Sequence, residues 1–157
     1  MNQLTYVSTV FKSRRHPEGR SAGLVYTRAL VGPIGACTTP LMIGATAAAL
    51  QGHPVWGYLV WGFPTAIVVA TVWTQFTLSN TLAEVHLRPG QVALKSIYDV
   101  LRNRSQTWSP LYNVQASQTY IEISVGWTTH IFRRKDWPRY ERLREAAQQA
   151  YRAPTPP

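Results

Sequence analysis

The chain has 157 residues, with 16 Lys and Arg against 7 Asp and Glu, and a formal net charge of +9. Its length suits one domain of ordinary size, and its single cysteine excludes an internal disulfide. No nucleic-acid motif accompanies the basic residues, so we expect no nucleic-acid partner. Basic residues beside a membrane segment are instead expected from membrane topology and from attraction to anionic lipids.

A long interval of the chain carries no formal charge, because residues 29–83 contain no Asp, Glu, Lys or Arg. Two apolar runs, residues 29–50 and 55–78, occupy this interval and are separated by a short turn. At 1.5 Å per residue the runs reach about 33 and 36 Å, and the hydrocarbon core of a bilayer is about 30 Å thick. The sequence therefore predicts a membrane hairpin of two transmembrane α-helices over residues 29–78.

Basic residues flank the hairpin on both sides, in the lead-in at residues 1–28 and in the segment after the second run. Tracts rich in Lys and Arg stay in the cytoplasm during insertion. We therefore expect a multi-pass membrane protein with both termini and the basic lead-in in the cytoplasm.

The predicted first helix is rich in small residues. Gly44 and Ala48 are four residues apart, and so are Ala45 and Ala49, which is the spacing that lets membrane helices approach closely. Two interpretations stay open: this face packs against the second helix of the same hairpin, or it docks another integral membrane subunit.

Aromatic residues lie near both ends of the second run. We expect Trp56, Tyr58, Trp61 and Trp73 to anchor the hairpin at the two membrane interfaces, where amphipathic rings settle. Contact with a flat pigment or quinone is the alternative. No charged residue and no histidine lies in the middle of either run, so we expect neither transport nor a haem or chlorophyll ligand, and we assign no cofactor.

The pattern after the hairpin changes from apolar runs to alternation of polar and apolar residues, which is typical of strands. A polar turn follows residues 84–87. Within residues 119–125 the alternation places Ile121, Ile123 and Val125 on one face and Tyr120, Glu122 and Ser124 on the other. Asp136 is predicted to cap a final helix, one face of which carries Trp137, Tyr140, Leu143, Ala147 and Tyr151. The expected strands are residues 84–87, 91–100, 108–115, 119–125 and 127–133. Residues 84–151 are therefore predicted to form a small α+β domain, an antiparallel sheet with a C-terminal helix, followed by a Pro-rich tail at 152–157.

Three short motifs carry a resemblance to a known family. They are Leu87-Arg88-Pro89-Gly90-Gln91-Val92, Trp108-Ser109-Pro110-Leu111-Tyr112, and the segment from Ile131 to Trp137. The arrangement resembles the YcxB-like proteins of bacteria and, more loosely, bacterial PH-like domains. The likeness covers about residues 24–150. It implies two helices in the bacterial cytoplasmic (inner) membrane, followed by a PH-like sheet domain in the cytoplasm. The chain departs from the family pattern at Arg133-Arg134-Lys135, where a Pro-Lys step is more usual. The resemblance supplies architecture rather than activity.

Residue types for catalysis do not form a recognisable constellation. The four histidines, His16, His53, His86 and His130, lack metal-ligand spacing, and the chain has neither a phosphate loop nor a nucleophile elbow. We expect no enzyme and no metal site.

The densest basic cluster is Arg133, Arg134, Lys135 and Arg139. It is either a solvated surface or a contact site for anionic lipids or an acidic partner. The resulting hypothesis is a non-catalytic accessory subunit of a larger bacterial membrane complex, respiratory or photosynthetic, that docks by its hairpin and clamps neighbours with its cytoplasmic domain. The alternative is a free-standing membrane-tethered module that binds anionic lipid headgroups or a peptide.

Overall fold

The computed structural model describes residues 8–153, and the chain forms two compact units. Residues 19–80 form the helical unit. The residues before and after this stretch, up to Glu18 and from Thr81 onward, together form the sheet unit. The sheet unit is thus assembled from two pieces of chain, and the helical unit is inserted between them.

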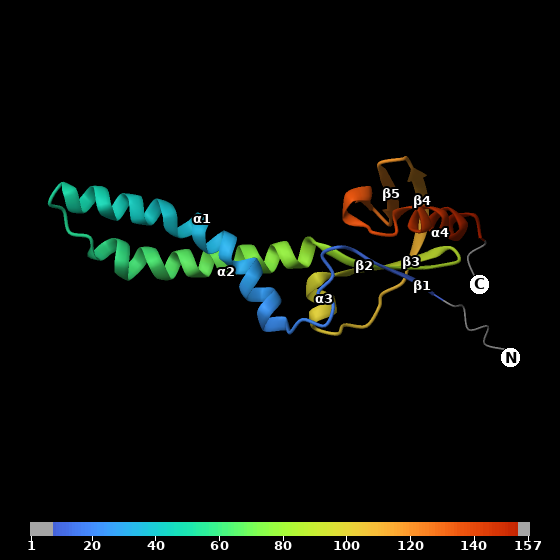
Figure 1. Cartoon of the computed structure of the whole chain (residues 1–157), viewed down its shortest axis with the longest axis horizontal. Helices are drawn as coiled ribbons and strands as arrows, with labels where there is room; N and C mark the ends of the chain where they lie inside the picture. The colour runs from blue at the N-terminus through green and yellow to red at the C-terminus, as the bar shows by residue number, and fades with distance from the viewer. Residues whose placement is uncertain (1–7, 154–157) are drawn as a thin grey trace. The chain divides into compact units, whose positions relative to one another are not determined.

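The helical unit contains α1 (Ala22–Leu50) and α2 (Phe63–Asn80), and a π-helical turn, η1 (Tyr58–Gly62), leads directly into α2. α1 and α2 lie side by side (Figure 1). Within residues 8–153, α1 and the helix over Tyr58–Asn80 are long and apolar enough to cross a membrane. The predicted pair of long apolar helices is therefore present, and its crossing of a bilayer stays a prediction.

Most of the buried residues of the helical unit are small. α1 has no fully buried residue, and the buried residues of α2 repeat every four positions: Ala66, Ala70, Thr74 and Leu78. Gly44 of α1 lies close to Tyr58, so that a Cβ added to this glycine would come within 3.0 Å of the Tyr58 ring. Close backbone approach, rather than burial of large side chains, holds the two helices together.

The π-helical turn lies immediately before Pro64. The N–H of Phe63 donates to the carbonyl of Tyr58, five residues back, which widens the helix at this point. A proline has no N–H, and its ring crowds the carbonyl one turn back, so a wider turn lets the helix continue through Pro64. α1 likewise continues through Pro33 and Pro40.

The sheet unit is an antiparallel meander in which every strand pairs with its sequence neighbours, in the order β1-β2-β3-β4-β5-β6 (Figure 1). Its strands are β1 (Thr9–Lys12), β2 (Leu82–Arg88), β3 (Gln91–Ser96), β4 (Ser109–Ala116), β5 (Tyr120–Val125) and β6 (Thr128–Arg133). Its helical elements are α3 (Ile97–Leu101), the 3₁₀ turn η2 (Arg134–Asp136) and α4 (Tyr140–Arg152). The predicted antiparallel sheet with a C-terminal helix is confirmed.

The core of the sheet unit is formed by inward-facing side chains of the strands and one face of α4. In β5, Ile121 and Ile123 are fully buried, whereas Tyr120 on the opposite face is 41% exposed. Leu143 of α4 is fully buried against this core. The alternation predicted for β5 and the apolar face predicted for the last helix both hold, except that Tyr151 is exposed.

Two contacts fix α4 against the sheet. The hydroxyl of Tyr140 donates to the carbonyl of Ser117 at 2.8 Å, at the start of the helix. At its other end, the N–H of Gly90 donates to the carbonyl of Ala150 at 2.8 Å. Gly90 has φ of +66°, in the left-handed region that glycine adopts without strain, so the β2–β3 turn can reach the helix.

The structure differs from the sequence prediction at three helix boundaries. α1 begins at Ala22, seven residues before the apolar run, because Arg28 is tolerated in a helix although it is not expected in lipid. Ile97–Leu101 is a short helix instead of the end of a strand. Asp136 does not cap the last helix, which begins at Tyr140; Asp136 instead ends η2 and lies 3.8 Å from the guanidinium of Arg15.

The lead-in predicted as a basic segment contains β1, which pairs with β2 from Thr9↔Leu87 to Lys12↔Glu84. Phe11 of β1 enters the core and is only 6% exposed. Part of the Pro-rich tail, residues 154–157, lies outside the described residues, as do residues 1–7.

Candidate functional site: a basic groove on the sheet unit

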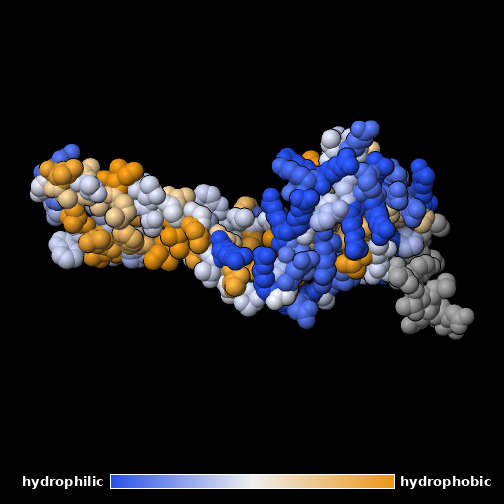
Figure 2. Space-filling model, viewed as in Figure 1, coloured by the Kyte–Doolittle hydropathy of each residue, from blue (hydrophilic) through white to orange (hydrophobic). Residues whose placement is uncertain are grey.

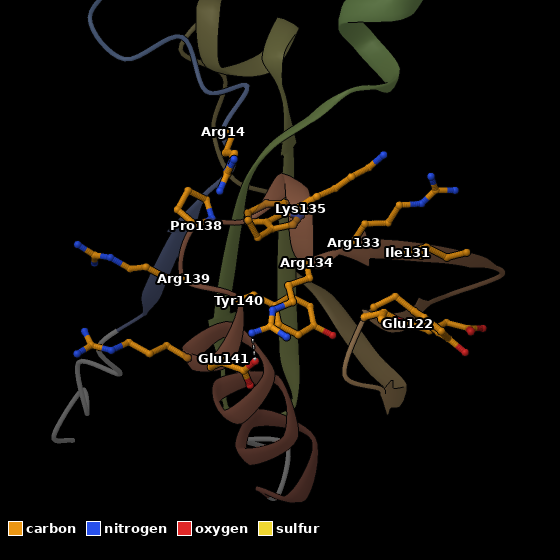
Figure 3. A pocket seen from close by; sticks show the side chains of 14 residues that line it. Arg14, Glu122, Ile131, Arg133, Arg134, Lys135, Pro138, Arg139, Tyr140 and Glu141 are labelled. Atoms are coloured by element: carbon orange, nitrogen blue, oxygen red, sulfur yellow. Dashed lines mark ion pairs between the residues drawn. The ribbon is translucent and has the colours of Figure 1, made fainter.

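An open groove of about 1100 Å³ lies beside β5, β6 and the start of α4. We call it the basic groove, because six of its lining residues are Lys or Arg. It is lined by Arg14, Thr119, Tyr120, Glu122, Ile131, Arg133, Arg134, Lys135, Trp137, Pro138, Arg139, Tyr140, Glu141 and Arg142. Figure 3 shows these side chains, which come from segments far apart in the sequence.

The strand alternation of β6 determines which of its side chains reach the groove. Phe132 points inward and is 1% exposed, so its neighbours Ile131 and Arg133 point outward. On β5, Glu122 lies opposite Ile131 and Tyr120 lies opposite Arg133. These two cross-strand pairs form the sheet side of the groove.

The segment between β6 and α4 supplies the remaining basic residues. The N–H of Arg134 donates to the carbonyl of Thr119 at 2.9 Å, which holds the start of η2 against β5. Trp137 is buried, and its ring meets that of Phe132 edge-on with centroids 5.5 Å apart. With Trp137 fixed inside, the flanking Lys135 and Arg139 are left at the surface.

The N-terminal segment contributes Arg14. Its backbone N–H donates to the carbonyl of Asp136 at 2.8 Å, directly after β1 has ended. Sequence reasoning did not connect Arg14 with the basic cluster, because more than a hundred residues separate them and only the β1–β2 pairing brings them together.

Most of the positive charge in the groove is uncompensated. Arg134 lies 3.5 Å from Glu141, and this ion pair is at the middle of the groove, with Arg133 and Lys135 to one side of it and Arg139 to the other (Figure 3). Among residues 8–153, no ion pair involves the other five basic residues of the groove: Arg14, Arg133, Lys135, Arg139 and Arg142. Such a surface attracts anions and acidic side chains.

The groove also has apolar and aromatic walls. Ile131 is 58% exposed and Tyr120 is 41% exposed, and Trp137 and Pro138 line the groove beside them. Burial raises the pKa of Tyr140, so its hydroxyl stays protonated at neutral pH and keeps its bond to Ser117. Figure 2 shows hydrophilic residues gathered over the sheet unit and apolar residues over the helical unit.

The residues predicted for the basic cluster are all brought together. Arg133, Arg134, Lys135 and Arg139 line one groove, although Arg134 is paired with Glu141. In the helical unit, Gly44, Ala45 and Ala48 are half-buried and Ala49 is exposed. Of the predicted anchors, Trp56, Trp61 and Trp73 are exposed by 70%, 76% and 50%, and Tyr58 is half-buried against Gly44.

A second cluster, which sequence reasoning missed, ties the N-terminal segment to β2. Both Glu84 carboxylate oxygens are occupied: Oε1 lies 2.8 Å from His16 Nε2, and Oε2 lies 3.0 Å from His86 Nε2. Burial raises the pKa of Glu84, but the hydrogen bonds and charges of His86 and His16 outweigh this effect and hold its pKa below the ordinary value. Among residues 8–153, no group of three His, Cys, Asp or Glu side chains is arranged to hold a metal ion.

Comparison of the chain with models of protein families, with curated proteins and with solved structures finds no match in any of the three. The resemblance to YcxB-like proteins therefore stays a prediction from three short motifs.

Proposed function

We propose that the chain is a non-catalytic accessory subunit of a larger bacterial membrane complex. Its helical unit joins this complex in the bilayer, and its sheet unit clamps neighbouring subunits through the basic groove. The observation that carries this proposal is the set of five groove bases that form no ion pair with any residue from 8 to 153. Each of them is available to an acidic group supplied by another molecule.

The composition of the groove favours a protein partner. Arginines and aromatic rings are enriched in the centres of protein interfaces, and both line this groove. Glu122 and Glu141 also line it and would repel a bare phosphate, whereas a protein surface of mixed charge can place a base opposite each of them.

The helical unit fits the same proposal. Around Gly32 and Gly35 of α1, a Cβ would meet no atom within 4 Å, so these positions are open. Small residues on an open helix face allow another membrane helix to approach its backbone closely. Respiratory and photosynthetic complexes are the hosts that we propose first.

A purification experiment tests the proposal. The full-length tagged chain, extracted with mild detergent from its own cells, is expected to carry other membrane subunits at a fixed stoichiometry, measured by native mass spectrometry. Replacing Arg133 and Arg139 by Glu should release them. Arg102→Glu with Arg152→Glu is the matched control, because these two exposed bases lie outside the groove. A chain that purifies alone, or an equal loss with the control pair, would contradict the proposal.

A second candidate function is binding of anionic lipid headgroups. The same unpaired bases favour it, because a base near an anionic membrane surface contributes about 1 kcal/mol. In nanodiscs of phosphatidylcholine, adding phosphatidylglycerol should then slow hydrogen exchange in β6 and η2, and salt should reverse this slowing. Exchange that is unchanged by phosphatidylglycerol would remove this candidate.

A further inference from the structure

The last strand of the sheet has a free edge. β6 is at the end of the strand order, and within the described part of the chain, residues 8–153, β5 is its one partner strand. In an antiparallel pair, alternate residues direct their N–H and C=O groups toward the partner strand. The N–H of Arg134 bonds to Thr119 on the β5 side, so Phe132 and His130 also face β5 in this alternation. The backbone groups of Thr129, Ile131 and Arg133 therefore point away from the sheet.

This edge is regular and unprotected. β5 and β6 keep one register over six residue pairs, from Tyr120↔Arg133 to Val125↔Thr128, without a bulge. Among residues 8–153, no backbone hydrogen bond joins Thr129, Ile131 or the N–H of Arg133 to a partner beyond β5. The carbonyl of Arg133 is occupied, because Arg133 precedes the 3₁₀ turn η2 and accepts the first hydrogen bond of that turn. Proteins usually protect such an edge with a bulge, a proline or a covering segment, because it is a template for another strand.

The free edge borders the basic groove. Ile131 and Arg133 belong to both features, since their side chains line the groove while their backbone groups point off the sheet. Lys135 and Arg139 follow directly along the chain and line the same groove. A strand that pairs with β6 thus runs past uncompensated positive charge, which selects for carboxylates.

We propose that an extended acidic segment of a partner protein adds to β6 as a further antiparallel or parallel strand, pairing with the backbone of Thr129, Ile131 and Arg133, and placing its carboxylates against the bases of the groove. This inference rests on the proposed accessory function and names how the sheet unit holds its neighbour. Main-chain hydrogen bonds supply the affinity in such strand addition, and side chains at every second position supply the specificity.

The dimensions agree with a short linear segment. Six strand residues reach about 20 Å at 3.3 Å per residue, so the partner needs about six residues in extended conformation. Side chains of that segment that face the groove meet Ile131 and Tyr120 as well as the bases. We therefore expect alternation of acidic and apolar residues rather than a run of acids.

Cross-linking in cells tests the geometry. A photo-reactive residue is placed at position 129, 131 or 133 of the full-length chain, and its cross-linked partner residues are mapped. Strand addition predicts that the three positions label partner residues in steps of two along one segment rich in Asp and Glu. A photo-reactive residue at Tyr112, which is 60% exposed on β4, is the control and should not label that segment. Cross-links to lipid, or to scattered protein positions, would overturn the inference.

Binding of a defined peptide tests the backbone pairing without any other subunit. The probe is a fluorescent peptide of alternating Glu and Val, added to the full-length chain in phosphatidylcholine nanodiscs. Its matched control has the same sequence with alternate backbone amides N-methylated, so that charge and side chains stay and one hydrogen-bonding edge is lost. We expect the methylated peptide to bind at least about tenfold more weakly, which corresponds to the loss of a few backbone hydrogen bonds.

Substitutions on the chain separate the contributions. The double substitution Arg133→Glu and Arg139→Glu should weaken binding of the unmethylated peptide to the chain. The control pair, Arg102→Glu and Arg152→Glu, should leave this binding unchanged. Equal binding of both peptides, or no binding of either, overturns strand addition. Because no other subunit is present, this assay can fail while a complex of fixed stoichiometry still purifies from cells, so that the two proposals fail separately.

Discussion

The two units of the chain differ in whether their large apolar side chains lie in the interior or at the surface. In the sheet unit, Phe132 and Leu143 are 1% and 0% exposed. In the helical unit, Ile43 and Trp61 are 66% and 76% exposed, while the buried positions hold residues such as Ala70. Most large apolar side chains are therefore interior in the sheet unit and exterior in the helical unit, with exceptions such as Leu78, 4% exposed, and Ile131, 58% exposed.

This contrast agrees with the predicted membrane location of the helical unit, which would place the two units in different solvents. Removal of apolar surface from water drives the core of the sheet unit. Within a bilayer, large apolar side chains gain little by leaving lipid, so helices associate through small residues that allow close packing. The predictions below test each side of this contrast.

The largest expected effect is truncation of a core aromatic residue. Phe132→Ala should lower the free energy of unfolding of the sheet unit by about 3–5 kcal/mol, because it removes a fully buried side chain and leaves a cavity. Ile43→Ala, on the exposed face of α1, should leave the helical unit unchanged. Hydrogen exchange of the full chain in nanodiscs measures both units. Equal losses of stability in the two variants would contradict the contrast between the two units.

The next effect is a charge placed on the exposed face of a helix. Val68→Lys, at a position 61% exposed in the middle of α2, should oppose membrane insertion by about 2.5–3.5 kcal/mol. Tyr112→Lys, at a similarly exposed position of the sheet unit, should have almost no effect. The fraction of chain that resists alkaline extraction from membranes is the measurement. Normal insertion of the α2 variant would show that this face meets water.

A pH-dependent effect is expected at Glu84. Glu84→Gln should lower the free energy of unfolding of the sheet unit by about 1–3 kcal/mol at neutral pH, because two histidines lose a charged acceptor. The folded pKa of Glu84 lies below its ordinary value of 4.5, so its contribution is complete above that value and disappears as pH falls through the folded pKa.

Urea unfolding at a series of pH values, followed by exchange of the β2 amides, measures this dependence. The difference between wild type and variant should narrow in acid. Glu145→Gln is the control, since Glu145 is exposed and forms no ion pair among residues 8–153. A difference that stays constant with pH would show that the carboxylate charge plays no part.

The smallest effect compares two helix caps. Ser96→Ala should lower the free energy of unfolding of the sheet unit by about 1 kcal/mol. The Ser96 hydroxyl accepts a hydrogen bond from the N–H of Asp99 at 3.1 Å, and the Asp99 carboxylate accepts hydrogen bonds from Ser96 in return. Ser21→Ala should cost less, because the Ser21 hydroxyl is 3.4 Å from the N–H of Leu24 at an exposed helix end. Amide hydrogen-exchange rates in α3 and in the first turn of α1 measure the effects of the two substitutions separately.

The sequence predicted the elements whose patterns are local. The uncharged interval revealed two long helices, and alternation revealed β5 and β6 with the correct inward residues, Ile121 and Ile123. α3 was missed although its capping box, Ser96-x-x-Asp99, can be read from the sequence. Asp136 looked like a cap, but the burial of Trp137 draws the chain inward and delays the helix to Tyr140.

Features that join distant segments were beyond sequence reasoning. β1 has only four residues, and its pairing with β2 depends on chain that follows the whole helical unit. For the same reason, the contributions of Arg14 to the groove and of His16 to the Glu84 cluster have no local signal. The bases of residues 133–139 were found because they are adjacent in sequence.

The pairing of β1 with β2 has a consequence for biosynthesis. β1 leaves the ribosome before the helical unit, yet its partner strand is made only after that unit. The first strand must therefore wait, with Phe11 uncovered, until both helices have been released and β2 has emerged. A hairpin that crosses a bilayer must also return the chain to the side on which β1 was left, so the sheet can close only when both ends of the hairpin lie on the same side.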